Sequence, residues 1–130
     1  MPLIYETIVT TLDANDQPHI APFGVRDENG LVLIAPFRPS NSLDNFLHHQ
    51  TAVINLTDDV RIFAGAFVGK RDWPLVPTDV IHGVRLATAL AHRELELVEI
   101  REHATRPALL FKVKHEVQHQ AFRGFNRAQA

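Results

Sequence analysis

The feature of this sequence that most restricts its fold is a strict alternation of residue types near the C-terminus. One side of the alternation holds Phe111, Val113, His115, Val117 and His119, and the other holds Lys112, Lys114, Glu116 and Gln118. A period of two is that of a β-strand, because successive side chains point to opposite faces of a sheet. The segment Leu109 to His119 is therefore predicted to be a strand.

The first 37 residues predict three more strands joined as an antiparallel meander. Ile4 to Leu12 contains a β-branched run, which favours a strand. His19 to Val25 alternates with period two, and Leu31 to Phe37 is apolar on both faces, as expected of a buried central strand. Turn residues occupy 13–18, and Asn29-Gly30 is a strong hairpin signal.

The middle of the chain mixes helices and strands. Pro39 to Gln50 predicts a helix capped by Ser40 or Ser42. Ala52 to Leu56 predicts a short strand. Val60 to Val68 predicts a second helix, with Ile62, Phe63, Ala66 and Phe67 on one face. Gly69 to Gly83, with two prolines, predicts a loop.

Val84 to Ile100 is ambiguous, because its Leu, Ala and Glu content favours a helix. Charged residues and leucines alternate from Arg93 to Leu97, however, and we therefore expect one long strand. About six strands with two or three short helices predict a mainly β protein, a closed or partly closed antiparallel barrel of Greek-key type.

Composition limits the classes of function. With 130 residues, 45% of them hydrophobic, the chain has the length of one domain with a real apolar core. The absence of cysteine excludes disulfides, thiolate catalysis and cysteine-ligated metal sites, and is consistent with the cytoplasm. A net charge of −2 without a basic run argues against nucleic-acid binding. We expect neither a membrane span nor a signal peptide, because no apolar run is long enough and the N-terminus lacks a basic region.

One motif suggests a metal site. His115-Glu116-Val117-Gln118-His119 matches the zinc-protease pattern H-E-x-x-H. That chemistry needs a helix, in which residues four apart lie on one face and close together. In a strand the two Cα atoms are roughly 13 Å apart, too far for both imidazoles to reach one zinc ion easily. We therefore expect no metal, and two strand histidines at the edge of the core. The other histidines form no ligand pattern, and no nucleophile or dinucleotide motif is present.

Several segments together carry a family resemblance. They are Ile4 to Thr11, His19 to Arg26, Pro36 to Ser40, Val53 to Val60 and Arg123 to Ala128. Their order and spacing resemble the DUF447 family. That family is similar to the FMN-binding split barrels, which include flavin reductases and pyridoxamine-phosphate oxidases. The resemblance runs from Ile4 to about Ala128.

The resemblance implies a split-barrel fold over residues 1–130 as a single domain. It also implies a homodimer, with FMN held near the interface between subunits. Members of the family usually continue past the Phe-Asn-Arg-Ala segment into a helical region, which is outside these 130 residues. The reaction of the family is not established, so the resemblance implies a cofactor more firmly than an activity.

Residue chemistry suggests where such a cofactor would bind. Arg38, Ser40, Asn41 and Ser42 offer a cation and hydroxyls at a helix start, which suits a phosphate, although Ser40 or Ser42 as helix cap and Arg38 in solvent is the structural alternative. Further candidates could contact the isoalloxazine ring or the ribityl chain: Pro22, Phe23, Gly24, Val25, Asn55, Thr57 and Asp58. Structural alternatives exist here too, since Phe23 could be core and Thr57 or Asp58 a helix cap. Asn126 and Arg127 could reach the phosphate, or form a polar tail.

The leading hypothesis is an FMN-dependent oxidoreductase of flavin-reductase type, with NADH or NADPH a plausible donor by analogy. No side chain is assigned as a catalytic acid or base. The first alternative is a flavin-binding protein without turnover, and the second a zinc-dependent hydrolase that uses His115, Glu116 and His119. A barrel that has lost its ligand and serves only in assembly is the last.

Overall fold

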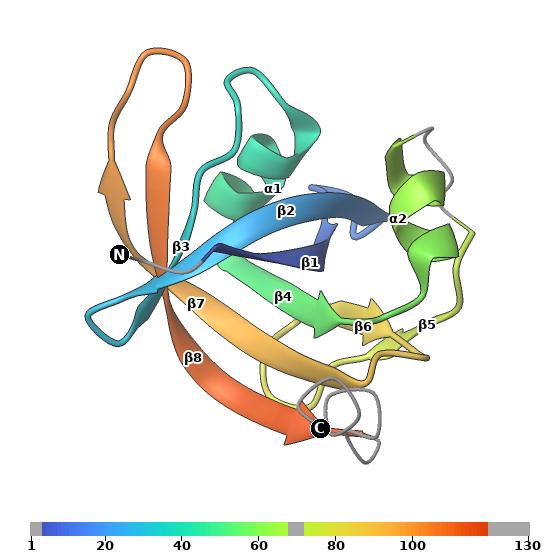
Figure 1. The fold of residues 1–130 in the computed structure, drawn as a ribbon. Helices are drawn as coiled ribbons and strands as arrows, with labels where there is room; N and C mark the ends of the chain where they lie inside the picture. Colours follow the sequence, from blue (N-terminus) through green and yellow to red (C-terminus); the bar gives the residue numbers. More distant parts are fainter. Residues whose placement is uncertain (1–3, 68–71, 120–130) are drawn as a thin grey trace.

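The computed structural model describes residues 4–67 and 72–119, and six strands form a closed antiparallel barrel in the order β1-β2-β3-β8-β7-β4 (Figure 1). The elements are β1 (Ile4–Leu12), β2 (Pro18–Glu28), β3 (Leu31–Ile34), α1 (Asn41–His49), β4 (Thr51–Leu56), α2 (Val60–Phe67), β5 (Leu75–Pro77), β6 (Val84–Leu86), β7 (Ala91–Arg101) and β8 (Ala108–Gln118). Strands β5 and β6 form a separate two-stranded sheet. The mainly β, antiparallel barrel predicted from the sequence is confirmed. Among the described residues, no helix has the length and apolar character required to cross a membrane.

The N-terminal meander is confirmed, since β1 pairs with β2 along its whole length and β2 pairs with β3, both antiparallel. Asn29 and Gly30 join β2 to β3 with φ values of 52° and 83°. A tight hairpin turn of this kind needs positive φ at both central residues, which explains the Asn-Gly pair.

The strand predicted over Leu31 to Phe37 is too long. Strand β3 ends at Ile34, and Phe37 is 62% exposed. Pro36 has no N–H to give to a neighbouring strand, and the carbonyl of Ala35 accepts a hydrogen bond from the Arg106 side chain instead. The chain therefore leaves the barrel just before the predicted helix.

The single strand predicted over Val84 to Ile100 is wrong, because it is divided into β6 and β7. Between them the backbone N–H of Ala87 bonds to Pro74 and that of Leu90 to Leu56, which turns the chain from the small sheet into the barrel. The described part of the predicted loop, residues 72–83, also contains β5. This strand is short and ends at Pro77, a residue that a strand end tolerates.

Strand β8 confirms the alternation that predicts it, but its residues do not form one continuous face. Register shifts interrupt its pairing with β7 between Glu94 and Leu95 and between Leu97 and Glu99. Leu109 and Phe111 enter the core, whereas Val113 is 38% exposed. Each bulge changes which side of the sheet the following side chains occupy.

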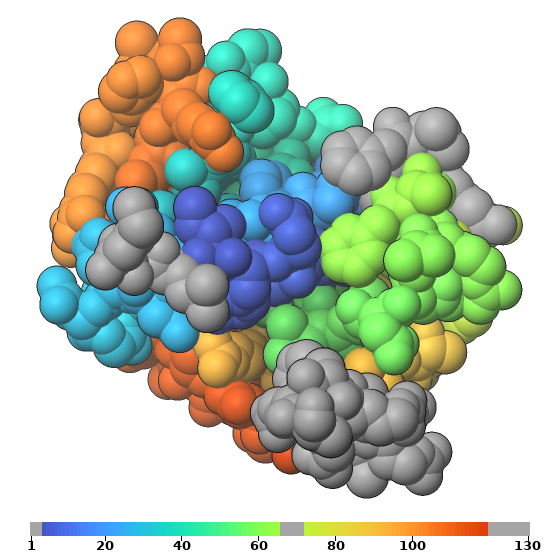
Figure 2. Space-filling view, viewed as in Figure 1, coloured from blue at the N-terminus to red at the C-terminus, as the bar shows by residue number. Residues whose placement is uncertain are grey.

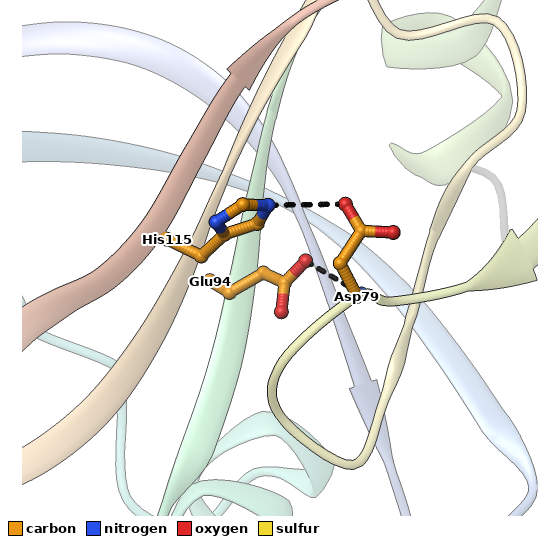
Figure 3. A group of neighbouring side chains, drawn as sticks. All are labelled: Asp79, Glu94 and His115. Atoms are coloured by element: carbon orange, nitrogen blue, oxygen red, sulfur yellow. Dashed lines mark hydrogen bonds and ion pairs between the residues drawn. The ribbon is translucent and has the colours of Figure 1, made fainter.

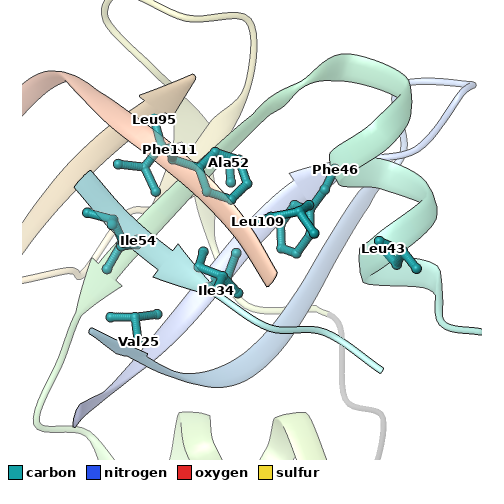
Figure 4. Packing of buried hydrophobic residues seen from close by; sticks show 11 residues of the cluster. Val25, Ile34, Leu43, Phe46, Ala52, Ile54, Leu95, Leu109 and Phe111 are labelled. Atoms are coloured by element: carbon teal, nitrogen blue, oxygen red, sulfur yellow. The ribbon is translucent and has the colours of Figure 1, made fainter. Parts of the chain in front are cut away.

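The main core fills the barrel and extends to α1 (Figure 4). Phe46 of α1 lies 5.5 Å from Phe111 of β8 and 5.9 Å from Phe23 of β2, measured between ring centroids. Phe46 and Phe111 are completely buried. Such burial stabilises the fold by about 2–3 kcal/mol for each side chain, so α1 closes one end of the barrel.

A second apolar cluster covers the outside of β1 and part of β2. It comprises Ile8, Ile20, Ile62, Leu86 and Ala89. Strand β1 is thus buried on both faces, with Val9 in the main core and Ile8 under α2 and β6. This cover explains why residues 7–12 are all buried, although the barrel needs only every second one inside.

Candidate functional site

Strand β2 has an edge at Pro22 to Gly24 that no described strand covers, and a ligand can reach its backbone there. On one side of β2, residues 18–26 pair with β1, and residues 27–28 lead into the turn. On the other side, β3 pairs only with Arg26 to Glu28. Pro22 and Gly24 lie in the stretch without a second neighbour. Pro22 removes a donor, as an edge strand tolerates, and Gly24 leaves its backbone exposed. Pro22 therefore lies at the edge of the sheet.

A pocket of about 280 Å³ lies against this edge. Its walls are Pro22, Phe23, Gly24, Ala35, Phe37, Ser40, Ser42 and Arg106. A second hollow of about 290 Å³ shares Gly24, Ala35 and Arg106 with it and continues toward Ile4. Together the two hollows follow the free edge of β2, and their combined volume is in the range of small-molecule sites.

Two loops frame the pocket at the same end of the barrel. The segment 35–40 precedes α1, and the segment 102–107 joins β7 to β8 (Figure 1). In the space-filling view these teal and orange segments meet at the upper end of the molecule (Figure 2). The N–H of Arg38 donates to the carbonyl of Thr105 at 2.8 Å and holds the loops together.

Arg106 supplies the positive charge of the pocket. Its Nε donates to the Ala35 carbonyl at 2.8 Å, and its guanidinium carbon lies 4.5 Å from the centroid of the Phe37 ring. His103 Nδ1 accepts from the backbone N–H of Arg106 at 3.0 Å and shapes the loop. Among the described residues, no carboxylate pairs with Arg106, so its terminal nitrogens are available to an anion.

The residues predicted as a phosphate loop divide between the pocket and its surroundings. Ser40 caps α1 by accepting from the Leu43 N–H at 3.1 Å, and Ser42 is buried on the pocket wall. Arg38 instead pairs with Glu102 at 3.0 Å beside a neighbouring hollow. Asn41 lines a different depression, near the turn between β1 and β2.

The remaining predicted site residues lie away from the pocket. Val25 is the exception, because it is in the core and also lines the second hollow. Asn55 is completely buried, where its Nδ2 donates to the Ile8 carbonyl and its Oδ1 accepts from the Leu86 N–H. Thr57 accepts from the Asp59 N–H ahead of α2, and Asp58 is exposed. Arg127 is outside the described residues.

A second polar cluster occupies the far end of β7 and β8. Asp79 from the segment between β5 and β6, Glu94 from β7 and His115 from β8 point toward one another (Figure 3). His115 Nε2 lies 3.1 Å from an Asp79 carboxylate oxygen. Glu94 is completely buried and accepts the backbone N–H groups of Asp79, Val80 and Ile81 at 2.7–2.9 Å.

This environment keeps Glu94 ionised. Burial raises the pKa of its carboxyl, but the hydrogen bond from His92 and the three backbone N–H groups outweigh that effect and bring the pKa to about 2. The His92 Nε2 atom lies 2.7 Å from Glu94, and the His92 Nδ1 atom lies 2.7 Å from Nε2 of His119. A buried carboxylate, a buried imidazole and a half-buried imidazole are thus connected in line.

The H-E-x-x-H segment does not form a common site. Its first four residues lie on β8, as predicted, His119 follows the end of the strand, and the members have different partners. Glu116 pairs with Arg93 at 3.0 Å, His115 contacts Asp79, and His119 contacts His92. The spacing that would bring two imidazoles together on a helix separates them here.

These features define the class of protein: a six-stranded antiparallel split barrel, with a pocket at an open strand edge between two loops and a helix start. Within that class the chain belongs to the family described as protein of unknown function (DUF447), N-terminal domain, whose model matches residues 5–120. A comparison with curated proteins found no match.

Solved structures share the fold at low sequence identity. An FMN-bound protein of the same family from Methanosarcina mazei has a TM-score of 0.77 and 18% identity over 90% of this chain and 61% of its own. The 2-nitrobenzoate 2-nitroreductase of Pseudomonas fluorescens has a TM-score of 0.75 and 20% identity, over 91% of this chain and 64% of its own. An NADH:FAD oxidoreductase of Streptomyces globisporus has a TM-score of 0.75 and 16% identity, over 91% of this chain and 71% of its own. The chain spans less than two thirds of the first two proteins.

Sequence reasoning missed the residues that give both sites their charge. Arg106 follows a turn of ordinary composition, and only the barrel brings it beside Ser42. His92 and Glu94 have the i, i+2 spacing that places two strand residues on one face, which was a usable signal. Nothing in the sequence indicates that His119 meets His92.

Proposed function

We propose that this protein binds a flavin, FMN, in the pocket at the open edge of β2, and acts as an FMN-dependent oxidoreductase of flavin-reductase type. The observation that carries the proposal is the convergence of a bare strand edge, a helix start and an unpaired arginine in one pocket. The FMN-bound family member from Methanosarcina mazei, with the same fold, supports it.

The residues present fit the parts of FMN. A phosphate suits Arg106, the Ser42 hydroxyl and the start of α1, where backbone N–H groups and the helix dipole favour an anion. Ser42 is buried and lines the pocket, which places its hydroxyl where a bound phosphate could use it. The edge at Pro22 to Gly24 would contact the ring, with Phe37 as an apolar neighbour.

The flavin would supply the hydride chemistry, and the pocket would bind and orient it. Among the described residues that line this pocket, Arg106 is the one with a charged side chain, so the walls contribute shape, apolar surface and one positive charge. NADH or NADPH is proposed as the reductant, by analogy with the oxidoreductase of Streptomyces globisporus. Flavin binding without turnover is the alternative.

We further propose a homodimer and a cytoplasmic location. The pocket is open to the surface, and Phe37 on its wall is 62% exposed, which favours a second subunit that closes over a bound ring. The absence of cysteine suits a reducing compartment.

Absorbance after FMN addition and desalting tests the binding proposal. The protein is expected to retain a yellow chromophore, and NADH or NADPH is expected to bleach it. Colourless protein would contradict flavin binding. Flavin that stays oxidised with both nucleotides would leave binding intact and favour the alternative without turnover.

Two arginine variants test which cation binds the phosphate. Arg106→Met should weaken FMN binding about tenfold or more, because it removes a charge-assisted contact, and should leave riboflavin binding unchanged, because riboflavin has no phosphate. Arg38→Met is the matched variant, since Arg38 pairs with Glu102. Fluorescence titration with both flavins gives the two affinities. A phosphate-specific loss in Arg38→Met alone would assign the phosphate to the originally predicted residue.

A further inference from the structure

We propose that Glu94, His92 and His119 form a proton relay in which the Nδ1 atom of His119 serves as a general base for a ligand bound at this end of the barrel. The relay is separate from the flavin pocket. Around the wall, Pro22 pairs with Ile8, Ile8 with Asn55, and Asn55 with His92. Three strand spacings place the two sites about 14 Å apart along the sheet.

The acceptor character of Glu94 fixes the hydrogens of the relay. An ionised carboxylate only accepts, so Nε2 of His92 must carry the hydrogen in the 2.7 Å contact with Glu94. We take His92 as neutral, so that its Nδ1 accepts and Nε2 of His119, 2.7 Å away, donates to it. This leaves the lone pair of His119 on Nδ1.

The relay can take up one proton and keep the charge balanced. When Nδ1 of His119 takes a proton from a ligand, its Nε2 hydrogen can pass to Nδ1 of His92. The imidazolium of His92 then lies beside the Glu94 carboxylate, which stays ionised, and the ligand becomes its conjugate base. A buried carboxylate that orients an imidazole and stabilises its cation is an established arrangement for general bases.

The cluster does not fit a metal site, although Asp79, Glu94 and His115 lie close enough to share an ion. Both oxygens of Glu94 already accept two hydrogen bonds each, one oxygen from His92 and the Asp79 N–H and the other from Val80 and Ile81. A carboxylate has about four lone-pair positions, so Glu94 has none left for a cation.

The outer end of the relay is a partly exposed imidazole. His119 is half-buried, and its Nδ1 has no hydrogen-bond partner among the residues that the structure describes. Burial, Arg85 of β6 and His92 lower the pKa of His119, while Asp79 raises it, with a net shift below the ordinary 6.5. The base is therefore unprotonated at neutral pH. Arg85 makes no ion pair with the described carboxylates, so a ligand that becomes an anion would be favoured here.

Imidazole ¹⁵N spectra of the full chain, with and without FMN, test the relay directly. Between pH 5 and 9 the ring nitrogens of His92 and His119 are expected to shift over the same pH range, because one proton is shared between them. Ring nitrogens of His92 that stay constant while His119 titrates would overturn the proposal. The result does not depend on the flavin, so failure of flavin binding leaves it readable.

A charge-removing variant adds a second measurement. Glu94→Gln should lower the titration midpoint of His119 by about one pH unit or more, because the charge that stabilises the cation is lost. Glu116→Gln removes an exposed carboxylate on the neighbouring strand and should shift it by less than about 0.3. Equal shifts in the two variants would contradict the relay. The wild-type spectra decide the question if Glu94→Gln does not fold.

Reactivity tests the basic nitrogen itself. Diethyl pyrocarbonate acylates neutral imidazole, and His119 is expected to react several-fold more slowly in Glu94→Gln than in the wild type at pH 7, with exposed His103 unchanged as an internal control. Mass spectrometry of peptides measures both rates. An unchanged His119 rate would show that Glu94 only supports the fold.

Discussion

At the scale of single residues, buried polar side chains connect elements of this barrel that are distant in sequence. Glu94 and Asn55 are both fully buried, and each is surrounded by partners that belong to other elements. Glu94 gathers the N–H groups of the segment between β5 and β6, and Asn55 joins β4 to β1 and β6. Removing either side chain would leave partners without hydrogen bonds.

Glu94 predicts a loss of stability in acid. Its carboxyl has a pKa of about 2 in the fold, below the ordinary 4.5, so the stabilisation is complete above pH 4.5 and is lost as the pH falls toward 2. The shift corresponds to about 3 kcal/mol. Urea unfolding between pH 7 and 2.5 should show this slope in the wild type and a weaker slope in Glu94→Gln. A variant with the wild-type slope would mean that other carboxyls cause the acid transition.

Asn55→Ala should lower the free energy of unfolding by about 3 kcal/mol, because a buried N–H and a buried carbonyl lose their partner. Asn41→Ala, at an exposed position, should change it by less than about 0.5 kcal/mol. Thermal and urea unfolding measure both. Equal values would show that the core adjusts around the missing amide.

At the scale of elements, the sequence predicts those with a clear period or cap. The meander, α1 with Ser40 as its cap, and β8 follow from alternation, Asn-Gly and the serine. The division of Val84 to Ile100 could not be predicted, because the turn at 87–90 is made by backbone bonds to Pro74 and Leu56, which are distant in sequence. Arg106 could not be predicted as a site residue either, because the contact that places it, to the carbonyl of Ala35, also joins residues distant in sequence.

The cap of α1 gives a prediction for that element. Ser40→Ala should destabilise the protein by about 1 kcal/mol, and Ser40→Gly by only a few tenths, because glycine is tolerated at a helix cap. If the helix start binds phosphate, both variants should also weaken FMN binding, measured by fluorescence titration. Weakened binding in Ala alone would point to a distorted helix rather than to a lost hydroxyl contact.

At the scale of the whole molecule, the barrel is asymmetric in its cover. One side of β1 lies under the cluster formed with α2 and β6, while the edge of β2 at Pro22 to Gly24 remains open. The covered side gives a stable frame, and the open side gives access to a ligand. The sequence alone predicts the barrel but not which part of it is left bare, because that depends on how short β3 is.

The cover should be needed for stability but not for flavin chemistry. Ile62→Ala removes a fully buried side chain between α2 and β1 and should cost about 2–4 kcal/mol. At a temperature where the variant is folded, its FMN affinity should equal that of the wild type. A large loss of affinity in the folded variant would connect the outer cluster to the pocket.

Pro22 also affects whether strands of two molecules can pair with each other. A strand with a bare side invites another chain to pair along it and begin an aggregate. Proline interrupts the row of donors in the middle of that stretch, and Gly24 has no side chain to add to a new pair. The edge of β2 can thus bind a small ligand, while pairing with a strand of another molecule is disfavoured.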